Sequence, residues 1–161
     1  AAKPLPVSAT CFHGGELTFR LSGAEPAVRA ARERLGGEEV MDGTAFWESV
    51  REQTHPFFQS GMPLWRLSIK PTTWPLFLPG KQFMEWGGAL RWFASEADAP
   101  AIRVAAENAG GHATLFRRNG PSHQADAFHP LPPAMLKIHR RLKEQFDPYH
   151  IFNPGRMYAE I

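Results

Sequence analysis

The side chains best able to do chemistry lie on one short run of alternating character. Residues 64–70 alternate apolar and polar side chains, which is the period of a half-buried β-strand. Arg66 and Lys70 then share the polar face with Ser68, about 14 Å apart at ~3.4 Å per residue. A guanidinium on such a face can hold a carboxylate through two parallel hydrogen bonds. The run predicts either a carboxylate site centred on Arg66 or the ordinary solvated face of an antiparallel sheet.

A second candidate lies between Phe83 and Phe93, a stretch that we interpret as one strand. On this strand Gly87 and Arg91 point to the same side. A glycine inside a strand marks the close approach of a ligand or of another backbone, and a bulge explains it equally well. Arg91 would extend the cationic face, so the candidate catalytic and substrate-binding residues are Arg66, Lys70 and Arg91.

The histidines do not predict a metal site. The seven histidines form no H-x-x-x-H or H-E-x-x-H pattern, and the single cysteine, Cys11, cannot build a thiolate site or an intramolecular disulfide. His112 is the histidine placed for a role, because it follows Gly110-Gly111 and begins a predicted strand. A hydrogen bond to the backbone explains it as simply as a contact with a ligand.

These residues must be positioned by an alternation of strands and helices. The patterns predict strands at 17–21, 38–40, 64–70, 83–93 and 112–118, helices at 26–35, 44–56, 100–109 and 133–146, and a loop at 119–132. This order indicates an α+β fold, with a ferredoxin-like antiparallel sheet and helices on one face, followed by a C-terminal helix and tail.

Composition excludes several classes of protein. The chain has 161 residues, 43% of them hydrophobic, which is typical of one globular domain. The 18 Lys and Arg residues are balanced by 16 Asp and Glu residues, so a nucleic-acid partner is not expected. The sequence has no uncharged apolar run long enough to span a bilayer and no secretory signal, so we expect a cytoplasmic protein.

The C-terminal run FDPYHIFNPGRMY, residues 146–158, resembles the terminal signature of FAD-linked oxidases of the vanillyl-alcohol oxidase type. Three further segments narrow the resemblance to the FAD-binding E-type subunits of bacterial glycolate oxidase, and they are LWRLS at 64–68, EWGGALRW at 85–92 and GGHATLFR at 110–117. The resemblance extends from about Leu5 to Tyr158.

The resemblance implies a division of the chain and a set of cofactor contacts. Residues 1–132 would be the α+β cap, or substrate, domain, and residues 133–161 a helix and Asn-Pro-Gly tail that returns to an FAD domain outside this chain. The tail would place Asn153 and Arg156 beside the FAD, although Asn153-Pro154-Gly155 is equally well explained as a plain turn. Gly87 and His112 complete the candidate cofactor-binding residues.

The resemblance also implies an activity and partners. The chain would be the C-terminal portion of an FAD-dependent 2-hydroxy-acid (glycolate) oxidase or dehydrogenase subunit. Hydride would pass from a small 2-hydroxy acid to the flavin, and electrons would then pass to an iron–sulfur subunit, beside a D-type flavoprotein subunit. Such a complex would be cytoplasmic or peripheral to the inner membrane. The alternative is a non-catalytic interaction or assembly domain of that complex, and a free-standing ferredoxin-like ligand-binding domain leaves the tail unexplained.

One family feature is missing from the sequence. No glycine-rich segment that would wrap the FAD pyrophosphate is present, because the four Gly-Gly pairs are isolated and each is explained by a turn, a helix end or a strand contact. We therefore expect that this chain alone does not bind FAD and is colourless. Without its flavin domain it would expose apolar surface and self-associate.

Overall fold

Six strands and four α-helices make up the part of the chain that the structure, a computed structural model, describes, namely residues 5–119 and 125–161. The strands are β1 (Val7–His13), β2 (Glu16–Leu21), β3 (Leu64–Ser68), β4 (Lys81–Glu85), β5 (Leu90–Ala94) and β6 (His112–Arg117). The helices are α1 (Glu25–Leu35), α2 (Gly43–Arg51), α3 (Ala99–Asn108) and α4 (Pro133–Phe146), with short 3-10 turns η1 (Pro56–Gln59) and η2 (Trp86–Gly88). Residues 120–124 of the predicted loop lie outside the described residues.

The strands form one sheet in the order β2-β1-β4-β5-β3-β6, and all its neighbouring pairs are antiparallel. Strands β3 to β6 have the order of a ferredoxin-like unit, with α3 as the connection between β5 and β6. The connection from β3 to β4 carries no helix, and residues 69–80 cross as a loop. The α+β class expected from the sequence is confirmed.

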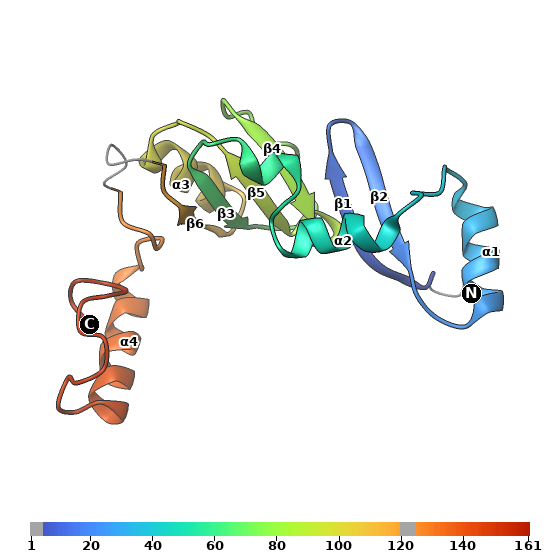
Figure 1. Cartoon of the computed structure of the whole chain (residues 1–161). Coiled ribbons are helices and arrows are strands. Elements are labelled where there is room, and N and C mark those ends of the chain that lie inside the picture. The colour runs from blue at the N-terminus through green and yellow to red at the C-terminus, as the bar shows by residue number, and fades with distance from the viewer. Residues whose placement is uncertain (1–4, 120–124) are drawn as a thin grey trace.

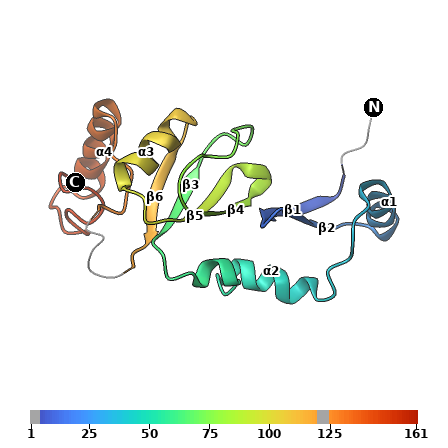
Figure 2. The ribbon, with the colours of Figure 1, turned by 90° about the horizontal axis from the view of Figure 1, so that it is seen from above.

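Helices pack on both faces of the sheet, whereas the sequence predicted helices on one face only. Trp65 and Leu67 of β3 pack on one face against Ile102 of α3. On the other face Leu64 and the strand residues around it pack against the end of α2 and η1. Figure 2 shows α2 and α3 on opposite sides of the sheet. The alternation of a strand makes this possible, because neighbouring side chains of β3 enter different cores.

Two of the predicted strands differ from the structure, and one observed strand was not predicted. The stretch 83–93 is a tight hairpin, because Trp86, Gly87 and Gly88 all have positive φ (51°, 61° and 95°), a conformation that no strand contains. Residues 38–40 form no strand, and β1, which pairs with both β2 and β4, was not predicted. The turn at Gly87 ends β4 and begins the return toward β5.

Gly111 is fixed by close packing at the end of α3. A Cβ at this position would lie 1.9 Å from the carbonyl oxygen of Ser68 in β3. The Gly110-Gly111 pair therefore lets the helix end press against the sheet, which agrees with a structural explanation of this pair.

The chain extends outward from this sheet at both ends. The β1–β2 hairpin and α1 lie at one end, and α4 with the C-terminal tail forms a separate lobe at the other (Figure 1). The two hydrophobic cores contain no residue of α4. Within the described residues no helix is long and apolar enough to span a membrane.

Two histidines lie within an aromatic cluster that joins the hairpin to the sheet. The ring of His13 stacks on Phe83, with centroids 5.4 Å apart, and lies 5.7 Å from the ring of His55. His13 Nδ1 donates to the carbonyl of Gln82, and His55 Nδ1 accepts from the backbone N–H of Phe57. Burial, and then the nearby His13, lower the pKa of His55 from its ordinary value of 6.5.

The lowered pKa of His55 predicts a loss of stability in mild acid. The unfolded chain binds the proton more tightly than the folded chain, so the stabilisation is complete above pH 6.5 and is lost as the pH falls through the folded pKa. We expect the urea midpoint of His55→Gln to fall less between pH 7 and pH 5 than that of the wild type. His139→Gln, which replaces a histidine on α4, is the control, and equal pH slopes for wild type and His55→Gln would contradict the prediction.

Candidate functional site

Arg66 is the centre of the candidate site, and it lies midway along β3, between β5 and β6. It lies directly opposite Trp92 of β5 and Thr114 of β6 in the strand register. Its side chain is half-buried, and the guanidinium carbon lies 5.9 Å from the centroid of the Trp86 ring. Such a contact with an aromatic face holds a guanidinium in place without using its hydrogen-bond donors. Arg66 is therefore positioned by a ring, and among the described residues its guanidinium donates no hydrogen bond, so its donors are available for another group.

A carboxylate lies near Arg66. Glu85, at the end of β4, accepts a 2.6 Å hydrogen bond from Nε1 of Trp92. Burial raises the pKa of Glu85, while the hydrogen bond from Trp92 and the charge of Arg66 act in the opposite direction. The carboxylate of Glu85 thus balances part of the positive charge of Arg66.

His112 is brought to the same region by the pairing of β6 with β3. It lies opposite Ser68 in the register, and its side chain is exposed. Burial of part of the ring, then His129 and Arg66, lower the pKa of His112. Because His112 pairs with Ser68 and Thr114 pairs with Arg66, His112 and Arg66 lie on the same face of the sheet.

One explanation of His112 was a hydrogen bond to the backbone. In the structure a different histidine, His129, makes such a bond, and the sequence patterns did not indicate this residue. Its Nδ1 accepts from the N–H of Ala113, so a neutral ring carries its proton on Nε2. Nε2 lies 3.0 Å from Oε1 of Glu107 and donates to it. The rings of His129 and His112 are 6.4 Å apart. No sequence signal could have found this histidine, because it lies in an irregular segment that folding brings beside β6.

Arg91 does not join the cationic face, which corrects the prediction. It lies opposite Leu67 in the register, and so it points to the α3 side of the sheet, away from Arg66. Only 2% of it is exposed, and its guanidinium donates to the carbonyl oxygens of Gly88, Trp74 and Thr73. The error arose from interpreting residues 83–93 as one strand, since the turn at Gly87 changes which face each residue occupies. Arg91 is a buried anchor for the loop that follows β3.

Lys70 and Gly87 lie at the margins of the candidate site. Lys70 is exposed, and its side chain runs over Gly110. Gly87 donates its N–H to Oγ1 of Thr10, and a Cβ built on it would meet nothing within 4 Å. Gly87 therefore serves the hairpin turn, and the close approach that was one of its two explanations is not seen among the described residues.

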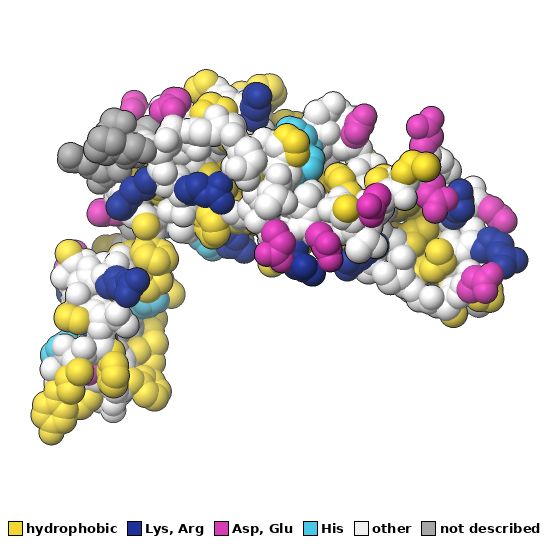
Figure 3. Space-filling view, viewed as in Figure 1, with side chains coloured by type: hydrophobic (Ala, Val, Ile, Leu, Met, Phe, Trp, Pro, Cys, Tyr) yellow, Lys and Arg dark blue, Asp and Glu magenta, His cyan; other side chains and the backbone are white. Residues whose placement is uncertain are grey.

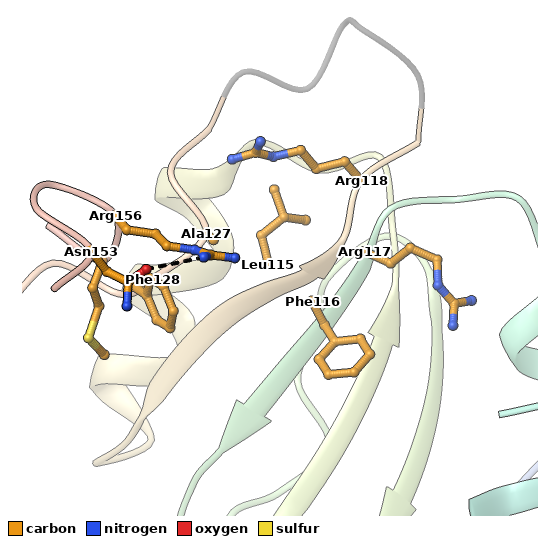
Figure 4. A pocket seen from close by; sticks show the side chains of 9 residues that line it. Leu115, Phe116, Arg117, Arg118, Ala127, Phe128, Asn153 and Arg156 are labelled. Carbon is orange, nitrogen blue, oxygen red and sulfur yellow. Dashed lines mark hydrogen bonds between the residues drawn. The ribbon is translucent and has the colours of Figure 1, made fainter. Parts of the chain in front are cut away.

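Asn153 and Arg156 line an open hollow on the other side of β6. The hollow has a volume of about 870 Å³ and lies between β6, residues 127–128 and the tail (Figure 4). Arg117 and Arg118 line it as well, and Nη1 of Arg156 donates to Oδ1 of Asn153 over 3.3 Å. None of the described residues that line this hollow is acidic, so it favours anions. Among the described residues no contact joins Asn153 to Arg66, so the two groups of predicted residues form separate sites.

Asp147 gives the tail its shape. Its two carboxylate oxygens accept from the N–H groups of Ile151 and Phe152, each over 2.9 Å, and Nζ of Lys143 lies 2.6 Å away. Burial raises the pKa of Asp147, but the hydrogen bond from Lys143 and those from Phe152 and Ile151 outweigh it and lower the pKa from 3.8 to about 2. The Asp-Pro part of the terminal motif is thus a structural device that presents the Asn153 turn.

Within the ranges that the structure describes, no group of three His, Cys, Asp or Glu side chains is placed to hold a metal ion.

The structure thus combines two features: an antiparallel sheet of the α+β class that carries Arg66 on one face, and an ordered tail that runs from Asp147-Pro148 to the turn at Asn153-Pro154-Gly155. In sequence the chain is similar to the glycolate oxidase subunit GlcE of Escherichia coli (strain K12), with 47% identity over 159 residues. The alignment covers 99% of this chain and 43% of that relative, so the chain spans less than half the relative's length. The predicted resemblance to E-type subunits is confirmed, and the match is consistent with a C-terminal fragment of such a subunit. No family model matches the chain, and no solved structure matches it.

The buried position of Arg91 predicts a large effect on stability. Arg91→Met leaves carbonyl oxygens of Thr73, Trp74 and Gly88 without their donor, and we expect a loss of about 2–4 kcal/mol in the free energy of unfolding. Arg66→Met is the matched control, because its guanidinium donates no hydrogen bond among the described residues, and it should lose less than about 1 kcal/mol. Urea denaturation measures both, and equal losses would contradict the assignment of Arg91 as an anchor.

Proposed function

We propose that this chain is the C-terminal part of an FAD-dependent 2-hydroxy-acid oxidase or dehydrogenase subunit that acts on glycolate, and that it helps to form the flavin and substrate site. The observation that carries the proposal is the 47% identity to a glycolate oxidase subunit along nearly the whole chain. The geometry around Arg66 supports it, because a held guanidinium with free donors suits the carboxylate of a hydroxy acid.

Arg66 is the residue to which we assign substrate binding. His112 faces the same space, and its lowered pKa favours the neutral ring, so it is able to accept a proton or a hydrogen bond beside the carboxylate. Lys70 lies two residues beyond Ser68 along the same chain direction and is exposed, so it would serve the rim of the site. Arg91 has no part in this assignment.

The residues of the tail suit one side of a bound FAD and not the whole of it. The arginines around the Asn153 hollow would stabilise negative charge, and Asn153 and Arg156 are the residues that would contact the cofactor. The sequence contains no glycine-rich segment of the kind that would wrap a pyrophosphate. When bound, the flavin supplies the acceptor for the hydride, while this chain would supply orientation and charge.

Helix α4 and the tail would dock on the flavin part of the same subunit. The apolar stripe of α4 belongs to neither hydrophobic core. Its side chains are exposed, and hydrophobic surface is visible on this lobe in Figure 3; the stripe consists of Met135, Ile138, Leu142 and Phe146. We propose that residues 1–132 act as the cap and that residues 133–161 return to the flavin part. In the isolated chain the same stripe would drive self-association.

The alternative of a non-catalytic assembly domain is favoured by one observation. The Arg66 group and the Asn153 hollow share no contact among the described residues, so they do not form a single closed pocket within this chain. If the flavin part joins the two, the catalytic assignment holds. If it does not, the chain would serve assembly with the iron–sulfur and D-type subunits.

Flavin binding tests the shared site directly. We expect this chain alone to be colourless after mixing with FAD, and the complete subunit to retain a stoichiometric flavin absorption spectrum. The reason is that only the tail side of the cofactor site lies here. A stoichiometric flavin spectrum from this chain alone would contradict the proposal.

Kinetics of the assembled enzyme test Arg66. Removing a charged hydrogen-bond donor costs about 1.5–3 kcal/mol, so Arg66→Ala should lower kcat/KM for glycolate by about tenfold or more. Arg29→Ala, which removes an exposed arginine paired with Glu25 on α1, is the control and should leave kcat/KM unchanged. Unchanged kinetics in Arg66→Ala would remove this residue from the site.

A further inference from the structure

Two aromatic side chains project from the loop that replaces a helix between β3 and β4. Trp74 is 84% exposed and Phe77 is 98% exposed. Their neighbours Leu76 and Leu78 turn inward and pack against the core on the α3 side. We call residues 71–80 the Trp74 loop. Its inner apolar face packs against the core, whereas its outer aromatic face is exposed.

The Trp74 loop is held in one shape from beneath. The buried guanidinium of Arg91 donates to the carbonyl oxygens of Thr73 and Trp74, and Nε2 of Gln82 donates to that of Leu76 over 2.8 Å. A buried charged donor that binds backbone carbonyls fixes the path of the chain and not merely one side chain. Trp74 is thus displayed by a backbone that is already ordered.

The end of the loop is clamped as well. The hydroxyl of Ser95, which is fully buried, donates to the carbonyl of Pro79. Gly80 has φ +142°, and a Cβ there would lie 2.5 Å from the carbonyl oxygen of Ala94, so the chain presses directly on the end of β5. Because the loop is ordered before binding, a partner that covers Trp74 and Phe77 need not order it, and preorganised aromatic side chains are typical anchors of protein interfaces.

The charges around the loop indicate the chemistry of what covers it. Residues 71–80 contain no charged side chain, and the exposed Lys81 follows the loop directly. Within the ranges that the structure describes, Lys81 is not paired with a carboxylate. An apolar centre with a cationic rim is complementary to an apolar pocket with a rim of Asp and Glu side chains.

The position of the loop indicates that the covering surface comes from another chain. Leu76 and Leu78 pack on the α3 side of the sheet, whereas Arg66 lies on the opposite face. A flavin part placed against Arg66 would leave the Trp74 loop pointing away from it.

From these observations we infer that the Trp74 loop is a docking surface for a different polypeptide of the oxidase assembly, one that presents an apolar pocket rimmed by carboxylates. The inference rests on the proposed function only in taking this chain as part of a subunit of an assembly.

The experiment uses the complete subunit expressed with its natural partner subunits. We expect the double variant Trp74→Ser/Phe77→Ser to retain tenfold less partner on affinity purification, because two anchoring rings are removed. Lys81→Glu should weaken co-purification as well. Hydroxyl-radical footprinting of the wild-type assembly should show Trp74 and Phe77 protected relative to the free subunit.

Met41→Ser is the matched control, because Met41 is fully exposed and lies outside the loop. It should leave co-purification unchanged, and all variants should keep the thermal midpoint and flavin content of the wild-type subunit. Undiminished co-purification in the double variant overturns the inference, as does a variant that abolishes only a dimer of this subunit. Suppose that the wild-type subunit holds no flavin and that the double variant still loses its partner. This outcome would reject the proposed function and support the docking surface.

Discussion

The structure depends on a single constraint, which is that β3 must bury side chains on both of its faces. Trp65 and Leu67 are fully buried toward α3, while Leu64 is buried toward η1. Neighbours on both edges, β5 and β6, satisfy its backbone. Arg66 alternates with these residues, so its place over Trp86 is set by the packing of its neighbours. A site built on such a strand is rigid, which suits the orientation of a small ligand.

The connection between β3 and β4 contains no helix, and Arg91 supplies hydrogen bonds to its backbone. A crossover without a helix leaves backbone carbonyls near the sheet that have no intrahelical partner. The guanidinium of Arg91 supplies several donors in a fixed geometry, and it accepts burial because each bond is made to a backbone carbonyl. One buried cation thus replaces the ordering that a helix would give, and the Trp74 loop is the result.

The C-terminal lobe is organised by a different principle. With no residue of α4 in either core, the tail is ordered chiefly by the carboxylate of Asp147, which binds two backbone N–H groups and Lys143. Tyr158 joins the lobe to the irregular segment beside β6 by donating its hydroxyl to the carbonyl of His129. Polar bonds fix the local shape of the lobe, while its apolar stripe is left for a surface elsewhere in the subunit.

The sequence by itself determined the elements whose patterns are local. The alternation at 64–70, the apolar stripe of α3 and the terminal motif each depend on neighbours along the chain, and they gave the α+β class and the resemblance correctly. The tertiary structure alone decided which residues share a face. Arg91 was misassigned because three consecutive positive φ angles at 86–88 turn the chain, and His129 was missed because only folding brings it beside Ala113. Periodicity encodes which residues of one element point together, whereas the meeting of separate elements depends on turns and packing that no local pattern contains.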